Sequence, residues 1–261
     1  MSRISKPLVV AAGICCLALG TATATEVQFR TVMGEINVNL FDDVTPQTVT
    51  NFLSYVNSGA YANNVVHRSE PGFVVQAGGF WYGGVLPLDS VATGTPVVNE
   101  AELSNVRGTL AMAKSPGNAN SATSQWFFNL GNNSANLDAQ NGGFTVFGQV
   151  LGNGMEVVDA IAQLNRFDLG GAANNAPLRN YSQADASAGV TVTDEHLVII
   201  TDIVVTDTAT LTHGELNPPV NTLINKVADA SQDSAGGGSL SGFSAIALLL
   251  IGIRKRFFIQ R

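Results

Sequence analysis

The stretch that decides the fold is "VHRSEPGFVVQAGGF", residues 66–80. Two apolar runs each carry one long polar residue, Arg68 in the first and Gln76 in the second, and Pro71-Gly72 supplies a turn between them. This pattern predicts two neighbouring β-strands. Because a guanidinium and an amide are costly inside an apolar sheet unless they are hydrogen-bonded, the pair marks a candidate site.

On the N-terminal side, the sequence predicts a β-hairpin and then a helix. In "VQFRTVMGEINVNL", residues 27–40, apolar and polar residues alternate on either side of Met33-Gly34, as in a hairpin with one buried face. The following "VTPQTVTNFLSYVNSGAY" has helical spacing of its apolar residues, with Thr45 as N-cap, Pro46 at the first helical position and Gly59 at the C-terminal stop. We expect an amphipathic helix of about three turns here.

On the C-terminal side, short strand-like runs are separated by Gly, Asn and Ser clusters. Residues 155–164 have the apolar spacing of a second helix, 165–188 read as a polar loop, and 195–206 read as a closing strand. The expected fold is mainly β, a single closed barrel whose two open ends are covered by the two helices. The strand-like runs are 64–68, 72–79, 109–114, 125–130 and 145–150.

The N-terminus reads as a signal peptide, residues 1–24. Arg3 and Lys6 precede an uncharged apolar run, and "ATA" at 22–24 supplies the small residues of a cleavage site. The alternative is an N-terminal membrane helix, but the run is short for about 30 Å of hydrocarbon. Both cysteines, Cys15 and Cys16, lie in this segment, so the processed protein is expected to carry no disulfide or thiolate chemistry.

The C-terminus reads as a linker followed by a membrane anchor or sorting signal. Residues 208–235 lose periodicity and are rich in small polar residues, which is typical of a flexible linker. In 236–261, three glycines lead to an apolar run from Leu240 to Ile253 and then to three basic residues at 254–256. This segment resembles the GlyGly-CTERM tails that rhomboid-type proteases clip in Gram-negative envelope proteins. A short buried helix is the alternative.

Charge and residue types exclude several function classes. Residues 25–235 hold all 20 acidic side chains and only seven of the 13 basic ones, which argues against a nucleic-acid partner. The three histidines, His67, His196 and His213, have no metal-ligand spacing, and no serine elbow, phosphate loop or dinucleotide fingerprint is present. The sequence therefore implies no metal and no cofactor. Its Gln125, followed by three aromatic residues, suits a pocket for an uncharged peptide.

Four blocks, "VHRSEPGFVVQAGGF", "GTLAMAK", "SATSQWFFNL" and "FTVFGQV", resemble the signature blocks of the cyclophilins, in particular their bacterial periplasmic branch. The resemblance covers residues 26–206 in family order. It implies an eight-stranded antiparallel barrel capped by two helices, and a peptidyl-prolyl cis-trans isomerase that acts on proline-containing polypeptides. The resemblance implies a cyclophilin-like isomerase domain at residues 25–207, and with the signal peptide it implies a protein of the periplasm or cell envelope of a Gram-negative bacterium.

The same resemblance assigns the site. Arg68 would donate a hydrogen bond to the prolyl nitrogen, Gln76 would orient the guanidinium, and Phe73 would complete the catalytic set. Asn136 stands where many members have tryptophan, which puts binding of a cyclosporin-type inhibitor in doubt. The expected substrate-binding residues are Val74, Ala113, Lys114, Gln125, Phe127, Leu137 and Phe144.

Two other functions stay open at this point. The barrel could be a non-catalytic proline-binding chaperone or scaffold, or a structural protein whose 165–188 loop makes the important contacts. Arg68 alone would more often be a structurally paired cation, and Phe73, Phe127 and Phe144 would by default be core. The intact Arg68 motif favours an enzyme over both alternatives.

Overall fold

The computed structural model describes residues 25–208 and 215–224. The predicted signal peptide (1–24), the predicted anchor (236–261), His213 and most of the predicted linker lie outside these residues. Within the described ranges, no helix is both long and apolar enough to cross a membrane. The predicted boundaries of these terminal segments stay predictions.

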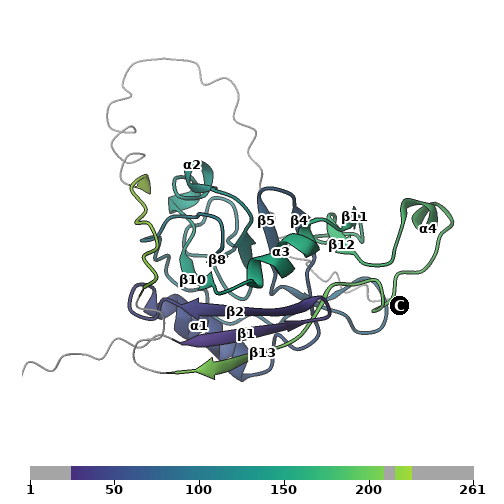
Figure 1. The fold of residues 1–261 in the computed structure, drawn as a ribbon, viewed down its shortest axis with the longest axis horizontal. Helices are drawn as coiled ribbons and strands as arrows, with labels where there is room; N and C mark the ends of the chain where they lie inside the picture. The colour runs from purple at the N-terminus through teal and green to yellow at the C-terminus, as the bar shows by residue number, and fades with distance from the viewer. Residues whose placement is uncertain (1–24, 209–214, 225–261) are drawn as a thin grey trace, which may run out of the picture.

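The sheet is built from the strands that the sequence predicted, with several short additions (Figure 1). A separate pair, β11 (Asn165–Phe167) and β12 (Ala176–Leu178), forms a two-stranded sheet. The strands of the main sheet are β1 (Glu26–Thr31), β2 (Gly34–Leu40), β3 (Asn64–Val65), β4 (Arg68–Glu70), β5 (Val74–Ala77), β6 (Phe80–Trp81), β7 (Asp89–Ser90), β8 (Thr109–Met112), β9 (Trp126–Asn129), β10 (Val146–Val150) and β13 (Ile199–Asp207).

The main sheet has eleven antiparallel strands in the order β4-β5-β9-β8-β10-β2-β1-β13-β3-β6-β7. The expected closed barrel of eight strands is therefore not what is observed: β4 and β7 are the two edges of an open, curled sheet. Only Val66 and His67 separate β3 from β4, although these strands lie near opposite ends of the order. This short link curls the sheet and brings its two ends towards each other.

Two helices match the predicted ones, α1 (Pro46–Asn57) and α3 (Gly154–Ala162). The N-cap of α1 differs from the expectation, because the Thr45 hydroxyl donates to the Phe41 carbonyl instead of accepting from the helix. Glu100 takes that role: its carboxylate accepts from the backbone N–H of Thr48 at 2.9 Å and of Gln47 at 3.2 Å. A carboxylate is well placed there, because the N-terminus of a helix carries partial positive charge.

The sheet separates two apolar clusters. Along β5, Val75 and Ala77 face the larger cluster, which contains Phe29, Phe52 and Trp126. Val74 lies in a second, smaller cluster on the other side. Because side chains alternate across a strand, one four-residue strand contributes to both clusters. The second cluster is the one that carries the candidate site.

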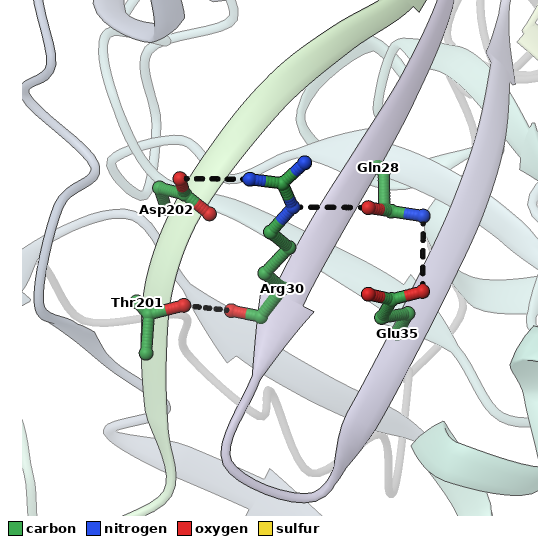
Figure 2. Close-up of polar contacts among 5 residues, drawn as sticks. All are labelled: Gln28, Arg30, Glu35, Thr201 and Asp202. Atoms are coloured by element: carbon green, nitrogen blue, oxygen red, sulfur yellow. Dashed lines mark hydrogen bonds and ion pairs between the residues drawn. The ribbon is translucent and has the colours of Figure 1, made fainter.

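The face of β1 that meets solvent is polar. Arg30 lies 3.4 Å from the Asp202 carboxylate on β13, and its Nε donates to Gln28, whose amide donates in turn to Glu35 on β2 (Figure 2). The Thr201 hydroxyl donates to the Arg30 carbonyl at 3.0 Å. Exposed pairs of this kind contribute little stability. This face therefore shows the ordinary inside-outside pattern of the hairpin, and it provides a comparison for Arg68, the half-buried arginine described below.

The segment 165–188 is not the plain polar loop that the sequence predicted. It holds β11, β12 and the short helix α4 (Gln183–Ser187), and Ser182 and Asp185 form a reciprocal capping box at the start of that helix. Two other short helical elements, α2 (Ser134–Leu137) and η1 (Gln140–Gly142), lie in the connection from β9 to β10. Both connections border the candidate site.

Candidate active site

The two polar residues of the opening stretch face each other across neighbouring strands. Arg68 on β4 is the register partner of Gln76 on β5, and Gln76 is the partner of Phe127 on β9. Directly opposed residues of antiparallel strands share one face of the sheet. The predicted pair of adjacent strands is thus confirmed, and it places an arginine, a glutamine and a phenylalanine in one row.

A chain of hydrogen bonds runs along this row. Arg68 donates from Nη1 to Gln76 Oε1 at 3.2 Å, and Gln76 donates from Nε2 to Gln125 Oε1 at 2.9 Å. Gln76 is only 5% exposed. Its amide therefore uses its acceptor on the guanidinium and one of its donors on Gln125, so that the position of each side chain depends on the next.

Arg68, in the row, and its chain neighbour His67 differ in charge. Burial lowers the pKa of Arg68 from its ordinary value, while the nearby Glu70 carboxylate acts in the opposite direction; an arginine nevertheless stays protonated. Burial, and then the charge of Arg68, lower the pKa of His67 to about 3. His67 packs its ring edge-on against Phe80 at 4.8 Å. It is therefore a neutral packing residue at physiological pH.

An apolar surface lies beside the guanidinium on the same side of the sheet. Phe127 and Phe144 meet edge to face, with ring centroids 5.9 Å apart. Val74 and Leu137 are buried members of the same cluster, and Phe73, just before β5, packs against it and is half-buried. The structure thus brings together all five residues that were expected to form an apolar slot.

Buried polar groups hold the chain segment that carries Leu137 and Phe144. The Phe144 N–H donates to the Leu137 carbonyl at 2.8 Å. Asn105 donates from its amide to the Phe144 carbonyl and to the Asp138 carboxylate, each at 3.0 Å. Asp138 also accepts from the Ser104 hydroxyl. Because these groups are buried and mutually bonded, they fix the apolar surface from behind.

The three remaining predicted residues, Ala113, Lys114 and Gln125, lie together but differ in what they offer. The Ala113 N–H donates to the Gln125 carbonyl at 2.9 Å, so this donor is already used. The Lys114 side chain is 1% exposed. Its ammonium lies 4.8 Å from the centre of the Phe144 ring and donates to the carbonyls of Asn141 and Gly143. Lys114 thus supports the Phe144 side of the site from inside, and burial lowers its pKa to about 8.

Sequence reasoning missed two residues beside Arg68. The Glu70 carboxylate lies 3.5 Å from Arg68 Nη2, and Asn175 donates to the same carboxylate at 2.8 Å. Glu70 had a usable signal, because residues two apart on a strand share a face. Asn175 had none, since it comes from a distant part of the chain. In the described part of the chain, no group of three His, Cys, Asp or Glu side chains could hold a metal ion.

Comparisons with known proteins identify the family of this chain. The family model described as cyclophilin type peptidyl-prolyl cis-trans isomerase/CLD matches residues 26–182. Peptidyl-prolyl cis-trans isomerase A of Dickeya dadantii (strain 3937) is 43% identical over 157 residues, which is 59% of this chain and 79% of that protein. Peptidyl-prolyl cis-trans isomerase B of Escherichia coli (strain K12) is 43% identical over 141 residues, 52% of this chain and 82% of that protein.

Solved structures give the same fold. A crystal structure of a Cryptosporidium parvum cyclophilin type peptidyl-prolyl cis-trans isomerase aligns with a TM-score of 0.52 and 23% identity, over 71% of this chain and 99% of that one. At this identity the likeness concerns the fold alone. The family model matches residues 26–182, and within this range the arginine–glutamine row lies beside the apolar cluster. The chain therefore belongs to the cyclophilin type peptidyl-prolyl cis-trans isomerases.

Proposed function

We propose that this peptidyl-prolyl cis-trans isomerase uses Arg68 as the hydrogen-bond donor that lowers the barrier to rotation about X-Pro bonds. The observation that carries the proposal is the placement of the Arg68 guanidinium. It is held by Gln76 on the same side of the sheet as a preformed apolar cluster. Such a site offers one fixed cationic donor beside a surface that suits a proline ring.

The chemistry of the reaction explains why one donor is enough. Resonance gives the C–N bond partial double-bond character and a barrier of roughly 18 to 20 kcal/mol. As the bond twists, the prolyl nitrogen loses resonance and becomes a hydrogen-bond acceptor, so a donor aimed at it stabilises the transition state more than the ground state. No proton is transferred in this scheme. A neutral His67 and a permanently charged Arg68 are compatible with it.

The remaining residues have positioning and binding roles in this proposal. Gln76 orients the guanidinium, and the proline ring lies against Phe73, with Val74, Phe127, Leu137 and Phe144 forming the wall behind it. Gln125 and the main chain at Ala113 and Lys114 contact the substrate backbone. The bond from Gln76 to Gln125 supports this division of roles, because it connects the catalytic row to the substrate-binding segment.

The test is the cis-to-trans rate of an Ala-Pro tetrapeptide, with the wild-type protein and Arg68→Ala. We expect kcat/KM to fall about 100-fold or more, as for other preorganised transition-state donors. The far-UV spectrum should not change. Arg30→Ala is the matched control, because Arg30 is an exposed arginine on β1 (Figure 2).

Two results would contradict the proposal in different ways. A fully active, folded Arg68→Ala variant would remove Arg68 from the mechanism and leave the activity to other residues. A folded wild-type protein that binds proline peptides without accelerating their isomerisation would leave the non-catalytic proline-binding module as the better account of this chain.

The setting of the reaction is also a proposal. The charged, apolar and small-residue pattern of 1–24 and the glycine-rich, apolar and basic tail 236–261 support export to the envelope of a Gram-negative cell. There the enzyme would assist folding of exported proteins, anchored through its tail or released by a rhomboid-type protease. Fractionation of cells that express the full chain would test this, and recovery in the cytoplasm alone would contradict it.

A further inference from the structure

Arg68 has a second partner besides Gln76, and this partner faces its other terminal nitrogen. Its Nη1 donates to Gln76, whereas its Nη2 lies 3.5 Å from Glu70 Oε1. Glu70 is two residues further along β4 and therefore lies on the same face of the sheet. The side chains of Arg68 and Glu70 are 11% and 34% exposed. The guanidinium is thus placed between an amide on the neighbouring strand and a carboxylate on its own strand.

The carboxylate of Glu70 is itself held in place. Asn175 donates from Nδ2 to Glu70 Oε1 at 2.8 Å, the same oxygen that faces Arg68. The Asn175 carbonyl also accepts from the Ser69 N–H at 2.9 Å, and Asn175 forms an isolated parallel bridge with Arg68. Since β4 is an edge of the main sheet, the backbone of Asn175 covers that edge. Its side chain also fixes the carboxylate of Glu70.

We propose that Glu70, held by Asn175, is a positioning residue for the Arg68 guanidinium. The proposal rests on the catalytic role given to Arg68 above. It also gives a function to the segment 165–188, which supplies Asn175 immediately before β12. An arginine side chain has much rotamer entropy to lose when it is fixed. Partners on two sides can remove that freedom before the substrate binds.

The distance between Arg68 Nη2 and Glu70 Oε1 indicates that the carboxylate orients the guanidinium without occupying its N–H donors fully. A charge-assisted hydrogen bond between these groups would be about 2.7 to 2.9 Å long. The observed 3.5 Å is a looser ion pair. Arginine has five N–H donors, so pairing with Gln76 and Glu70 leaves donors for a prolyl nitrogen. A fully bonded pair would instead weaken the guanidinium as a donor to the substrate.

The simpler reading is an ion pair that stabilises the edge of the sheet and nothing else. Many ion pairs near the surface contribute little to the free energy of unfolding. The two readings differ in where their effect appears. A purely structural pair would change the free energy of unfolding and leave kcat alone. A positioning residue would change kcat and would act only when Arg68 is present.

The experiment compares five single variants of the full chain: Arg68→Ala, Glu70→Ala, Glu70→Gln, Asn175→Ala and Asn174→Ala. Asn174 is the matched control, because it is the exposed asparagine next to Asn175. For Glu70→Ala we expect kcat to fall about tenfold with KM within about twofold, because the guanidinium acts in the transition state. Glu70→Gln keeps an acceptor and should therefore restore most of the lost activity, to within about threefold of wild type. Asn175→Ala should lower kcat by several fold, and Asn174→Ala should not.

Two combinations decide whether Glu70 acts through Arg68 and Asn175 through Glu70. Glu70→Ala/Asn175→Ala should be no slower than Glu70→Ala alone. Adding Glu70→Ala to Arg68→Ala should not lower the residual rate further. Wild-type kcat in folded Glu70→Ala and Asn175→Ala, or strictly additive losses in the combinations, would overturn the proposal. An active Arg68→Ala variant would instead show that the proposed catalytic role of Arg68 has failed.

Discussion

Burial sets the charge or the direction of individual side chains around the candidate site, among them His67 and Lys114. The Arg68–Gln76 pair follows from strand alternation around a Pro-Gly turn, and the structure places the two in register. The inward direction of the Lys114 side chain and the loss of charge at His67 could not be predicted, because both depend on burial by distant parts of the chain. Burial is a property of the folded molecule and leaves no local pattern around one residue.

His67 makes stability depend on pH. Its pKa falls from 6.5 in an unfolded chain to about 3 in the folded protein, chiefly because the ring is buried. Below pH 6.5 the unfolded chain therefore binds a proton that the folded protein does not bind. This group should lower the free energy of unfolding as the pH falls from 6.5 towards 3, by at most about 1.4 kcal/mol per pH unit.

Urea unfolding at pH 7, 6, 5 and 4 measures this contribution. His67→Phe removes the titrating group and keeps an aromatic ring against Phe80, so its stability should fall less steeply with pH than that of the wild type. Equal slopes for the two proteins would mean that His67 is protonated in the folded state as readily as in the unfolded one.

At the element scale, the strength of the periodic pattern decided what could be predicted. The hairpin β1–β2 and the helices α1 and α3 are long enough to show an alternating or helical pattern, and their positions are confirmed. The strands β11 and β12 have three residues each, too few for any period to appear. The closed barrel of eight strands, which the family resemblance implied, is not confirmed, because the main sheet is open and has eleven strands, including the two-residue strands β6 and β7.

The two glycines after β5 allow stability and catalysis to be separated. A Cβ on Gly78, whose φ is +84°, would lie 2.4 Å from the Ser124 carbonyl oxygen. Backbone cannot move aside easily, so we expect Gly78→Ala to lower the free energy of unfolding by about 2 to 3 kcal/mol. A Cβ on Gly79 would instead lie 2.6 Å from Gln125 Cδ, the far end of a side chain.

Gly79→Ala should therefore displace Gln125 and break its hydrogen bond with Gln76. We expect kcat/KM to fall several fold while stability changes by less than about 1 kcal/mol, because a side chain can turn away at low cost. Urea unfolding and the Ala-Pro peptide assay on both variants test the pair. Full activity in Gly79→Ala would show that the bond from Gln76 to Gln125 does not support the site.

At the scale of the whole molecule, the domain uses residues far beyond the matched family region, which ends at 182. Residues 215–224 fall within the predicted linker, yet they contact the folded domain. Ser104 donates from its N–H to the Pro219 carbonyl at 2.8 Å, and Val220 forms a bridge with Leu103. Leu216 packs against the apolar cluster that contains Phe127 and Phe144. No periodic pattern of apolar residues predicts such contacts, because they depend on single residues.

Asn221 is the residue on which this contact depends most. It is 6% exposed. Its side-chain amide donates to the Ala101 carbonyl at 3.1 Å and to the Asp138 carbonyl at 3.0 Å, and its backbone N–H donates to the Glu102 carbonyl at 2.8 Å. Asn221→Ala would leave two buried carbonyls without these donors, and each unsatisfied buried group costs about 1 to 3 kcal/mol. We expect a loss of about 2 kcal/mol in the free energy of unfolding, measured in urea, in one cooperative transition.

The matched control is Asn217→Ala, which changes an exposed asparagine of the same segment and should leave stability within about 0.5 kcal/mol of wild type. If the segment were only a tether, both variants would unfold like the wild type, because a tether contributes no contacts to the folded domain. If it is part of the domain, only Asn221→Ala is destabilised. Losing the Asn221 hydrogen bond to Asp138 would then loosen the Asp138 and Asn105 network that fixes Phe144. The isomerase site would thus depend on residues that follow β13, the last strand of the sheet.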